Sequence, residues 1–301
     1  MIKKLASIVP IFTLLIAISC QKEVKLKQLP YDSKLSIECL ITPNNYPKLY
    51  LNKTVPYLTG KAYNSSFFVR NATIKITSNL DSISFVPDSI FNYVQCDYTY
   101  FYIGNTKIAS NTNYNLTITY YNKTYTANCT TNQPIVNIDS TDYVQKFKDL
   151  YGEHEGVVLH YNDPPTEGQF YRYDMQRLID SSAYKANLAT NGKSPCINNQ
   201  IILVHEIGRA IYSDKNANGQ ISTITFEPAY KHKLNDTCYI KMQTMDKNAF
   251  DYYDQLDRQK LAQFNPFVEP TYLKPTQFKD AFGCFGAYSI SNDSVLFVYP
   301  E

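Results

Sequence analysis

Short segments in which apolar and polar residues alternate recur along most of the chain. In LSIECLI (35–41), every second residue from Leu35 to Ile41 is apolar, which is the period of a half-buried strand. LYLNKTV, NATIKITS and TCYIKMQTM repeat this alternation, and the stretches between them are rich in the turn residues Asn, Asp, Gly and Pro. The pattern predicts a mostly β protein.

The strand-like segments form two regions. Residues 31–133 predict an immunoglobulin-like β-sandwich, because several short strands follow one another within about 100 residues. Residues 140–301 predict a second β-rich domain that ends in a hairpin of sequence GAYSISNDSVLFVYP. In this domain, residues 246–264 carry apolar side chains at a helical period, and Asp246 can cap the N-terminus. The expected fold is a β-sandwich followed by a β-rich domain that carries one amphipathic helix.

The clearest hairpin signal is the segment NLTITYYNKTYTANCT. If Asn122 and Lys123 are the two turn residues, Tyr120 faces Tyr125 and both strands bury one consistent apolar face. We therefore predict this register.

The N-terminal segment MIKKLASIVPIFTLLIAISC predicts export. Two lysines precede an apolar run, Leu5–Ile18, that is too short to span a membrane and is typical of a signal peptide. Its end resembles a bacterial lipobox, in which cleavage precedes a cysteine that carries diacylglycerol. We expect a lipoprotein signal peptide at 1–19, a lipid anchor on Cys20 and a polar tether at 20–30. An ordinary signal peptide followed by a chance cysteine is the alternative.

The charge of the chain argues against nucleic acid as a partner. The full chain has 29 Lys and Arg residues and 27 Asp and Glu residues. Residues 1–19 contain two lysines and no acidic residue, so their removal leaves a formally neutral chain. Binding to phosphate backbones needs a concentrated basic surface.

An exported chain permits disulfides. Six cysteines remain after Cys20, and no pair of them has the CxxC spacing of a zinc site. Cys39 and Cys129 lie on the apolar faces of the first and last strands of the first region, and are the first disulfide candidate. Two buried free thiols are an equally weighted alternative.

Sequence motifs of catalysis do not support an enzyme. HEIGR begins like a zinc-protease helix, but its fifth residue is Arg209 instead of His. There is no G-x-S-x-G nucleophile elbow and no glycine-rich phosphate loop. We expect a protein without catalytic residues and without a cofactor.

A candidate ligand-binding position is Arg172, which stands between Tyr171 and Tyr173. An arginine flanked by aromatic residues can bind a carboxylate or stack on a sugar or peptide plane. The alternative is a packed, salt-bridged residue of a strand.

The segment SDKNANGQIS resembles the start of a calcium loop, with Asp214, Asn216 and Asn218 at alternate positions before Gly219. The twelfth position of such a loop needs a bidentate carboxylate, but Thr225 stands there. We therefore favour a turn at which two strands reverse, with no metal site beyond a weak surface cation on these three residues.

The order of these segments resembles a family of Bacteroidetes lipoproteins catalogued as domain of unknown function 4249. The resemblance is carried by the lipobox and tether and then, in order, by LSIECLIT, YPKLYLNKTVPY, VRNATIKIT, YNKTYTANCTT, HYNDPPTEGQFYRY, YSDKNANGQ and GCFGAYS. It implies an outer-membrane lipoprotein with an N-terminal β-sandwich and brings no catalytic residues. Members are often encoded beside TonB-dependent outer-membrane receptors.

We therefore expect a lipid-anchored outer-membrane protein that acts as a non-enzymatic binding or accessory subunit of a TonB-dependent nutrient-uptake system. The expected partners are the outer membrane, through the anchor, and a TonB-dependent receptor. The alternative is a structural or adhesive cell-surface lipoprotein without a transporter partner.

Overall fold

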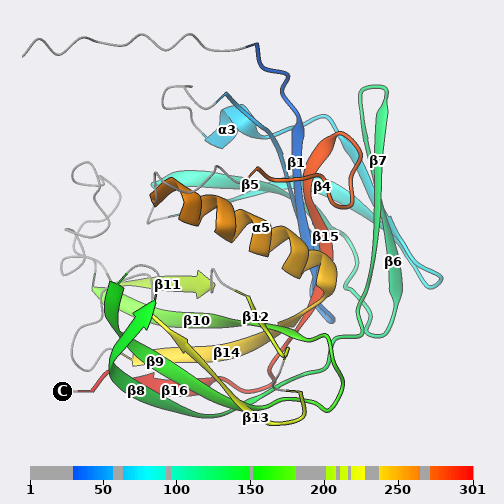
Figure 1. Ribbon diagram of the computed structural model, residues 1–301. Helices are drawn as coiled ribbons and strands as arrows, with labels where there is room; N and C mark the ends of the chain where they lie inside the picture. The colour runs from blue at the N-terminus through cyan, green and yellow to red at the C-terminus, as the bar shows by residue number, and fades with distance from the viewer. Residues whose placement is uncertain are drawn as a thin grey trace, which may run out of the picture.

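The computed structural model describes residues 30–56, 64–92, 96–149, 152–180, 201–207, 211–215, 218–227, 237–264 and 272–300. Figure 1 shows two regions of strands with one long helix between them. The described residues contain two helices, α3 (Asn64–Phe67) and α5 (Lys247–Phe264), and neither is long and apolar enough to cross a membrane. Strands dominate the described residues, which confirms the prediction of a mostly β protein.

The strands of the first region are β1 (Leu35–Ile41), β2 (Lys48–Lys53), β3 (Thr73–Thr77), β4 (Ser82–Asn92), β5 (Asp97–Gly104), β6 (Asn113–Tyr120) and β7 (Lys123–Thr130). Those of the second region are β8 (Ile138–Asp149), β9 (Gly152–Asn162), β10 (Phe170–Asp180), β11 (Ile201–Ile207), β12 (Tyr212–Ser213), β13 (Ile221–Phe226), β14 (Thr237–Met245), β15 (Ala281–Ile290) and β16 (Val295–Val298). One large sheet has the order β11-β10-β14-β15-β1-β2-β5-β4-β3-β6-β7, with β12 beside β10 and β16 beside β14. Strands β13, β9 and β8 form a second sheet.

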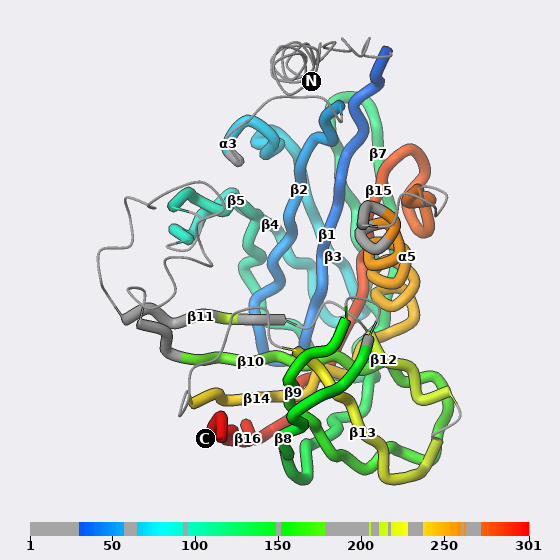
Figure 2. Tube along the Cα trace, turned by 60° about the vertical axis from the view of Figure 1, so that its left-hand side comes forward, coloured from blue at the N-terminus to red at the C-terminus, as the bar shows by residue number. Residues whose placement is uncertain are grey.

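Strand β15 connects the two regions. Its C-terminal end pairs with β14, and its N-terminal part pairs in parallel with β1, with Gly283 opposite Ile37. Figures 1 and 2 show the red-orange β15 beside the blue β1. One sheet therefore crosses the predicted boundary between residues 133 and 140.

The predicted closing hairpin is wrong. Strands β15 and β16 do not pair with each other in the part of the chain that the structure describes; both pair antiparallel with β14, one after the other. Ser291, between them, still donates its backbone N–H to the carbonyl oxygen of Met242 on β14 (2.8 Å). The turn residues between β15 and β16 therefore interrupt a single line of pairing along one edge of β14.

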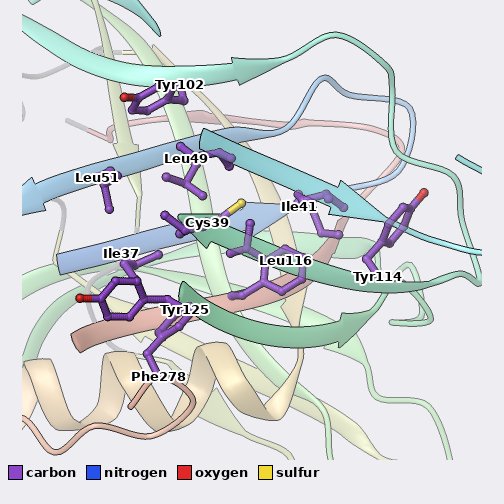
Figure 3. Packing of buried hydrophobic residues seen from close by; sticks show 14 of the residues in the cluster. Ile37, Cys39, Ile41, Leu49, Leu51, Tyr102, Tyr114, Leu116, Tyr125 and Phe278 are labelled. Carbon is purple, nitrogen blue, oxygen red and sulfur yellow. The ribbon is translucent and has the colours of Figure 1, made fainter. Parts of the chain in front are cut away.

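The core of the first region contains the alternating apolar residues that the sequence pattern identifies, and Phe278, Ala281, Phe285 and Ala287 from the C-terminal part of the chain complete it. Figure 3 shows side chains from β1, β2, β5, β6 and β7 pointing toward one another. On β1 the buried positions are Leu35, Ile37, Cys39 and Ile41. Strand β4 pairs with β3 through its first residues and with β5 through the rest, so it connects the two halves of this core. The finer assignment to an immunoglobulin-like topology stays a prediction.

The hairpin of β6 and β7 exists, but its predicted register is wrong by two residues. Tyr120 pairs with Lys123, and Ile118 pairs with Tyr125. The turn residues are Tyr121, which has a φ of 51°, and Asn122. A shift of two residues leaves every side chain on the same face, so the apolar pattern cannot distinguish the two registers.

The predicted disulfide between Cys39 and Cys129 is also wrong. Both cysteines are buried free thiols, which confirms the alternative prediction of two unpaired buried cysteines. Cys39 packs as a small apolar residue among its β1 neighbours in the core. Burial raises the pKa of both thiols, which keeps them protonated and unreactive.

Helix α5 lies where the sequence predicts it, and Asp246 caps it. Its Oδ1 accepts a hydrogen bond from the backbone N–H of Ala249 (2.9 Å), and its Oδ2 accepts one from Ala287 on β15 (3.0 Å). Gly286 permits this close approach, because a Cβ there would lie 2.8 Å from Oδ1 of Asp246. The first turn of the helix is thereby fixed on β15.

Candidate functional site

A pocket of about 800 Å³ lies where helix α5 meets the outer face of β1 and the strands β10, β11 and β14. The N-terminal part of the helix is held in place: Asp246 fixes its start on β15, and Phe250 stacks on Phe170 of β10, with ring centroids 4.1 Å apart. The pocket is lined by Glu38, Leu40, Thr42, Asn45, Tyr46, Lys48, Tyr50, Ile103, Arg172, His205, Gln243, Tyr253, Leu256, Asp257 and Tyr288.

Strand β1 supplies one wall through the residues that its core does not use. Glu38 and Leu40 alternate with the buried positions and therefore face the helix. The hydroxyl of Tyr253 on α5 donates a hydrogen bond to Oε1 of Glu38 (2.6 Å). Burial, with the charge of Glu38, raises the pKa of Tyr253, so this hydroxyl stays a neutral donor.

Arg172 on β10 is the buried cation of the pocket, with 5% of its surface exposed. Its Nε donates a hydrogen bond to Oε1 of Gln243 on the neighbouring strand β14 (2.6 Å). Its guanidinium carbon lies 4.8 Å from the ring centroid of Tyr253, which is cation–π distance. The neighbouring strand and the helix together fix the plane of the guanidinium.

A chain of side-chain hydrogen bonds continues from Gln243 to the mouth of the pocket. Its Nε2 donates to Oδ2 of Asp174 (2.9 Å), and Oδ1 of Asp174 is bonded to Nε2 of His205. The hydrogen bond to Asp174 raises the pKa of His205, while burial and the charge of Arg172 act in the opposite direction. His205 is half-exposed, whereas Asp174 is nearly covered.

Of the three predicted ligand-binding residues, the structure places only Arg172 in the pocket. Tyr171 and Tyr173 point to the opposite face of β10, because consecutive strand residues alternate in direction. Tyr171 is fully buried, and its hydroxyl donates to Oδ1 of Asp163. Tyr173 stacks on Phe226 in the core of the second region. The aromatic ring that contacts Arg172 instead comes from helix α5.

Of the three residues of the predicted weak cation site, the structure gives side-chain hydrogen bonds to Asp214, whereas the buried Oδ1 of Asn218 has no hydrogen-bond partner among the described residues. Oδ2 of Asp214 accepts hydrogen bonds from the backbone N–H groups of Gly168 (2.8 Å) and Gln169 (3.1 Å). Asn216 lies outside the described residues, as does the predicted anchor Cys20. Within the described ranges, no three His, Cys, Asp or Glu side chains are grouped so that they could hold a metal ion.

The prediction that this segment reverses two paired strands is wrong. Strand β12 before it pairs with β10 of the large sheet, whereas β13 after it pairs with β9 of the three-stranded sheet. Gly219 adopts a φ of 70° in the turn and donates its N–H to Oδ2 of Asp163 (3.0 Å). The turn therefore carries the chain from one sheet to the other.

Sequence reasoning missed most of the pocket. Arg172 and Asp174 are two residues apart, so they share one face of β10, and this spacing was the available signal. Glu38 gave a weaker signal, because it is a charged residue on the face of the first strand opposite the apolar residues. His205 belongs to the HEIGR segment, which lacks the second histidine of a zinc-protease motif and therefore gives no sequence signal for a site.

Comparison with protein families identifies a match for this chain. No curated protein matches the sequence. A family model matches most of the chain, from the residue after the predicted anchor to the loop before β16, and this confirms the family that the order of segments indicates. The chain belongs to the family described as Domain of unknown function (DUF4249), whose model matches residues 21–294.

Proposed function

We propose that this protein is an outer-membrane lipoprotein, anchored through Cys20, that acts as a non-enzymatic binding or accessory subunit of a TonB-dependent nutrient-uptake system. The observation that carries the binding role is the pocket of about 800 Å³ beside α5. The lipobox-like sequence before Cys20 supports the anchor.

The size and the lining of the pocket suit a small ligand. Small-molecule sites typically measure about 300–1,000 Å³ and combine apolar walls with a few placed polar groups. Here Leu40, Ile103 and Leu256 supply apolar surface. Arg172 and Glu38 supply charged groups whose positions are fixed by hydrogen bonds. A site prepared in this way binds without first ordering its own side chains.

The hydrogen-bond pattern favours binding over proton transfer. Both carboxylate oxygens of Asp174 are occupied, one by Gln243 and one by His205. Tyr253 donates to Glu38, and its raised pKa keeps it protonated. These groups hold one another in place, which is what a binding site requires of them.

Co-purification tests the proposal. The full chain is tagged at its C-terminus, expressed in its own host from the native locus, extracted in mild detergent and purified. We expect a large β-barrel receptor to be recovered at a one-to-one ratio. The Cys20→Ala variant is the matched control, and we expect it in the soluble fraction with the receptor lost or reduced.

Two results would overturn the proposal. Membrane retention of the Cys20→Ala variant would contradict the proposed lipid anchor on Cys20. Recovery of the membrane-bound protein without any β-barrel receptor would contradict the proposed accessory role and favour the structural or adhesive alternative.

A further inference from the structure

We propose that the pocket binds a carboxylate group of its ligand, and that the Nη1 and Nη2 groups of Arg172 are the donors. This inference rests on the proposed binding function and names the chemistry of the ligand. It depends on four features of Arg172: its burial, the absence of an ion-pair partner among the described residues, the atoms it leaves unused and the negative charges around it.

Arg172 is a buried cation that forms no direct ion pair with a carboxylate of the described residues. Among the residues that the structure describes, no Asp or Glu oxygen lies within ion-pair distance of its guanidinium. Arg258, an exposed arginine of α5, does have such a partner in Asp254, with Nε and Oδ2 2.9 Å apart. Removing an unpaired charge from water is unfavourable, so the site is completed by an anion from outside the chain.

The nearby carboxylates are already engaged with other groups. Both oxygens of Asp174 bond to Gln243 and His205. Oε1 of Glu38 accepts from Tyr253. These bonds hold the two carboxylates away from the guanidinium and leave its outer edge for a ligand.

The unused atoms of Arg172 have the geometry that a carboxylate requires. Its Nε is occupied by Gln243, whereas Nη1 and Nη2 have no hydrogen-bond partner within the described part of the chain. Neither of these nitrogens belongs to the fully buried atoms that lack a partner in the described part of the chain, and Arg172 lines the pocket. Two neighbouring N–H groups in one plane match the two oxygens of a carboxylate.

The surroundings favour a singly charged anion over phosphate. Glu38 and Asp257 line the same pocket together with the cations Lys48 and Arg172, and the carboxylate of Asp174 accepts a hydrogen bond from Gln243, so carboxylates outnumber the two permanent cations. These negative groups repel a doubly charged phosphate more strongly than a carboxylate. A carboxylate of this kind can come from a peptide C-terminus or from a sugar acid, and the probes below distinguish the two sources.

Calorimetric titration of the detergent-solubilised full chain tests the inference. The probes are N-acetyl-Ala-Ala and glucuronate, their neutral counterparts N-acetyl-Ala-Ala amide and glucose, and inorganic phosphate. We expect one of the two acids to bind about tenfold or more tightly than its neutral counterpart and than phosphate, because a charge-assisted bidentate contact is lost in the others.

Variants of two arginines locate the contact. Arg172→Met keeps much of the side-chain volume, removes the charge, and should abolish the preference for the acid. Arg258→Met, on the same helix as Tyr253, should keep the wild-type preference. Arg172→Lys should weaken binding of the acid several-fold, because the lysine ammonium is a point charge and lacks the two parallel N–H groups of the guanidinium. This variant replaces Arg172→Met in the test if Arg172→Met does not fold.

Equal binding of acids and amides, tighter binding of phosphate, no binding of any probe, or an acid preference that survives both Arg172 substitutions would overturn the inference. Its failure is separable from that of the proposed function. A receptor that co-purifies while no acid is preferred leaves the uptake role intact, and acid binding without a receptor leaves the pocket chemistry intact.

Discussion

The two faces of strand β1 lie in different surroundings. Ile37, Cys39 and Ile41 on the inner face are fully buried in an apolar cluster. Glu38 and Leu40 on the outer face line the pocket beneath helix α5 and are only partly covered. The inner face is closed by apolar packing, whereas the outer face is organised by hydrogen bonds between side chains.

This difference separates stability from binding within one strand. Apolar packing in a closed core contributes to the free energy of unfolding in proportion to the surface it removes from water. A polar pocket leaves buried charges and open volume that packing could otherwise fill, and such sites commonly lower stability for the sake of function. We therefore expect substitutions on the inner face to unfold the protein and substitutions on the outer face to change binding.

The largest effect is expected at Gly283, where β15 lies beside β1 in the sheet and approaches the backbone of Ile37. Its φ is 124°, and a Cβ there would lie 1.7 Å from the backbone oxygen of Ile37. Gly283→Ala should cost about 4 kcal/mol or more, or prevent folding, because two backbones would have to separate. Urea denaturation followed by circular dichroism measures this change.

The control for this substitution is Gly168→Ala. Gly168 also has a positive φ, 98°, but a Cβ there would meet no atom within 4 Å. It should cost only the backbone strain, about 1–2 kcal/mol. Equal costs at the two glycines would show that the β1–β15 contact is not what makes Gly283 necessary.

A smaller difference in unfolding free energy is expected between two leucines on opposite faces of the same sheet. Leu49 of β2 is fully buried in the first core, and Leu49→Ala should cost about 2–5 kcal/mol through lost burial and a cavity. Leu40 of β1 is partly buried at the pocket, and Leu40→Ala should cost about 1 kcal/mol. A cost at Leu40 as large as that at Leu49 would contradict the distinction between the two faces.

The alternation of residues in the sequence predicted which face of a strand is buried, but not which strand lies beside it. Ile37 and Ile41 were assigned to the core correctly from their period of two. The pairing of β1 with β15 depends on a contact between the two ends of the chain, for which a local pattern has no signal. The register of β6 and β7 was wrong for a related reason, because a shift by two residues preserves the pattern.

The pocket could be predicted only in part, since it is built from segments that are distant in sequence. Arg172 was identified from its two tyrosine neighbours, yet the alternation of a strand places both on the other face. Its actual partners are Tyr253 on the helix and Gln243 on β14. Each looked like an ordinary residue of its own element, and only the packing of α5 against the sheet brings them to Arg172.

The smallest effect tests whether the outer face responds to pH. The bond to Asp174 raises the pKa of His205 above its ordinary value near 6.5, so the folded state holds this proton more tightly than the unfolded state. The resulting stabilisation is present in full below about pH 6.5 and is lost as the pH rises through the raised pKa. Because His205 is half-exposed, we expect only a few tenths of a kcal/mol between about pH 6 and 8.

The variant that tests this effect is His205→Gln, which should remove the slope of unfolding free energy against pH in that window. His160→Gln, at a His–Asp pair on β9 outside the pocket, leaves the bond between His205 and Asp174 intact and should keep the slope. Urea titrations at closely spaced pH values measure both variants. A slope that survives in His205→Gln would assign the titration to another group. Loss of the slope would show that His205 makes the stability of the pocket face depend on pH. The inner face of β1 is lined by apolar side chains and has no comparable charge.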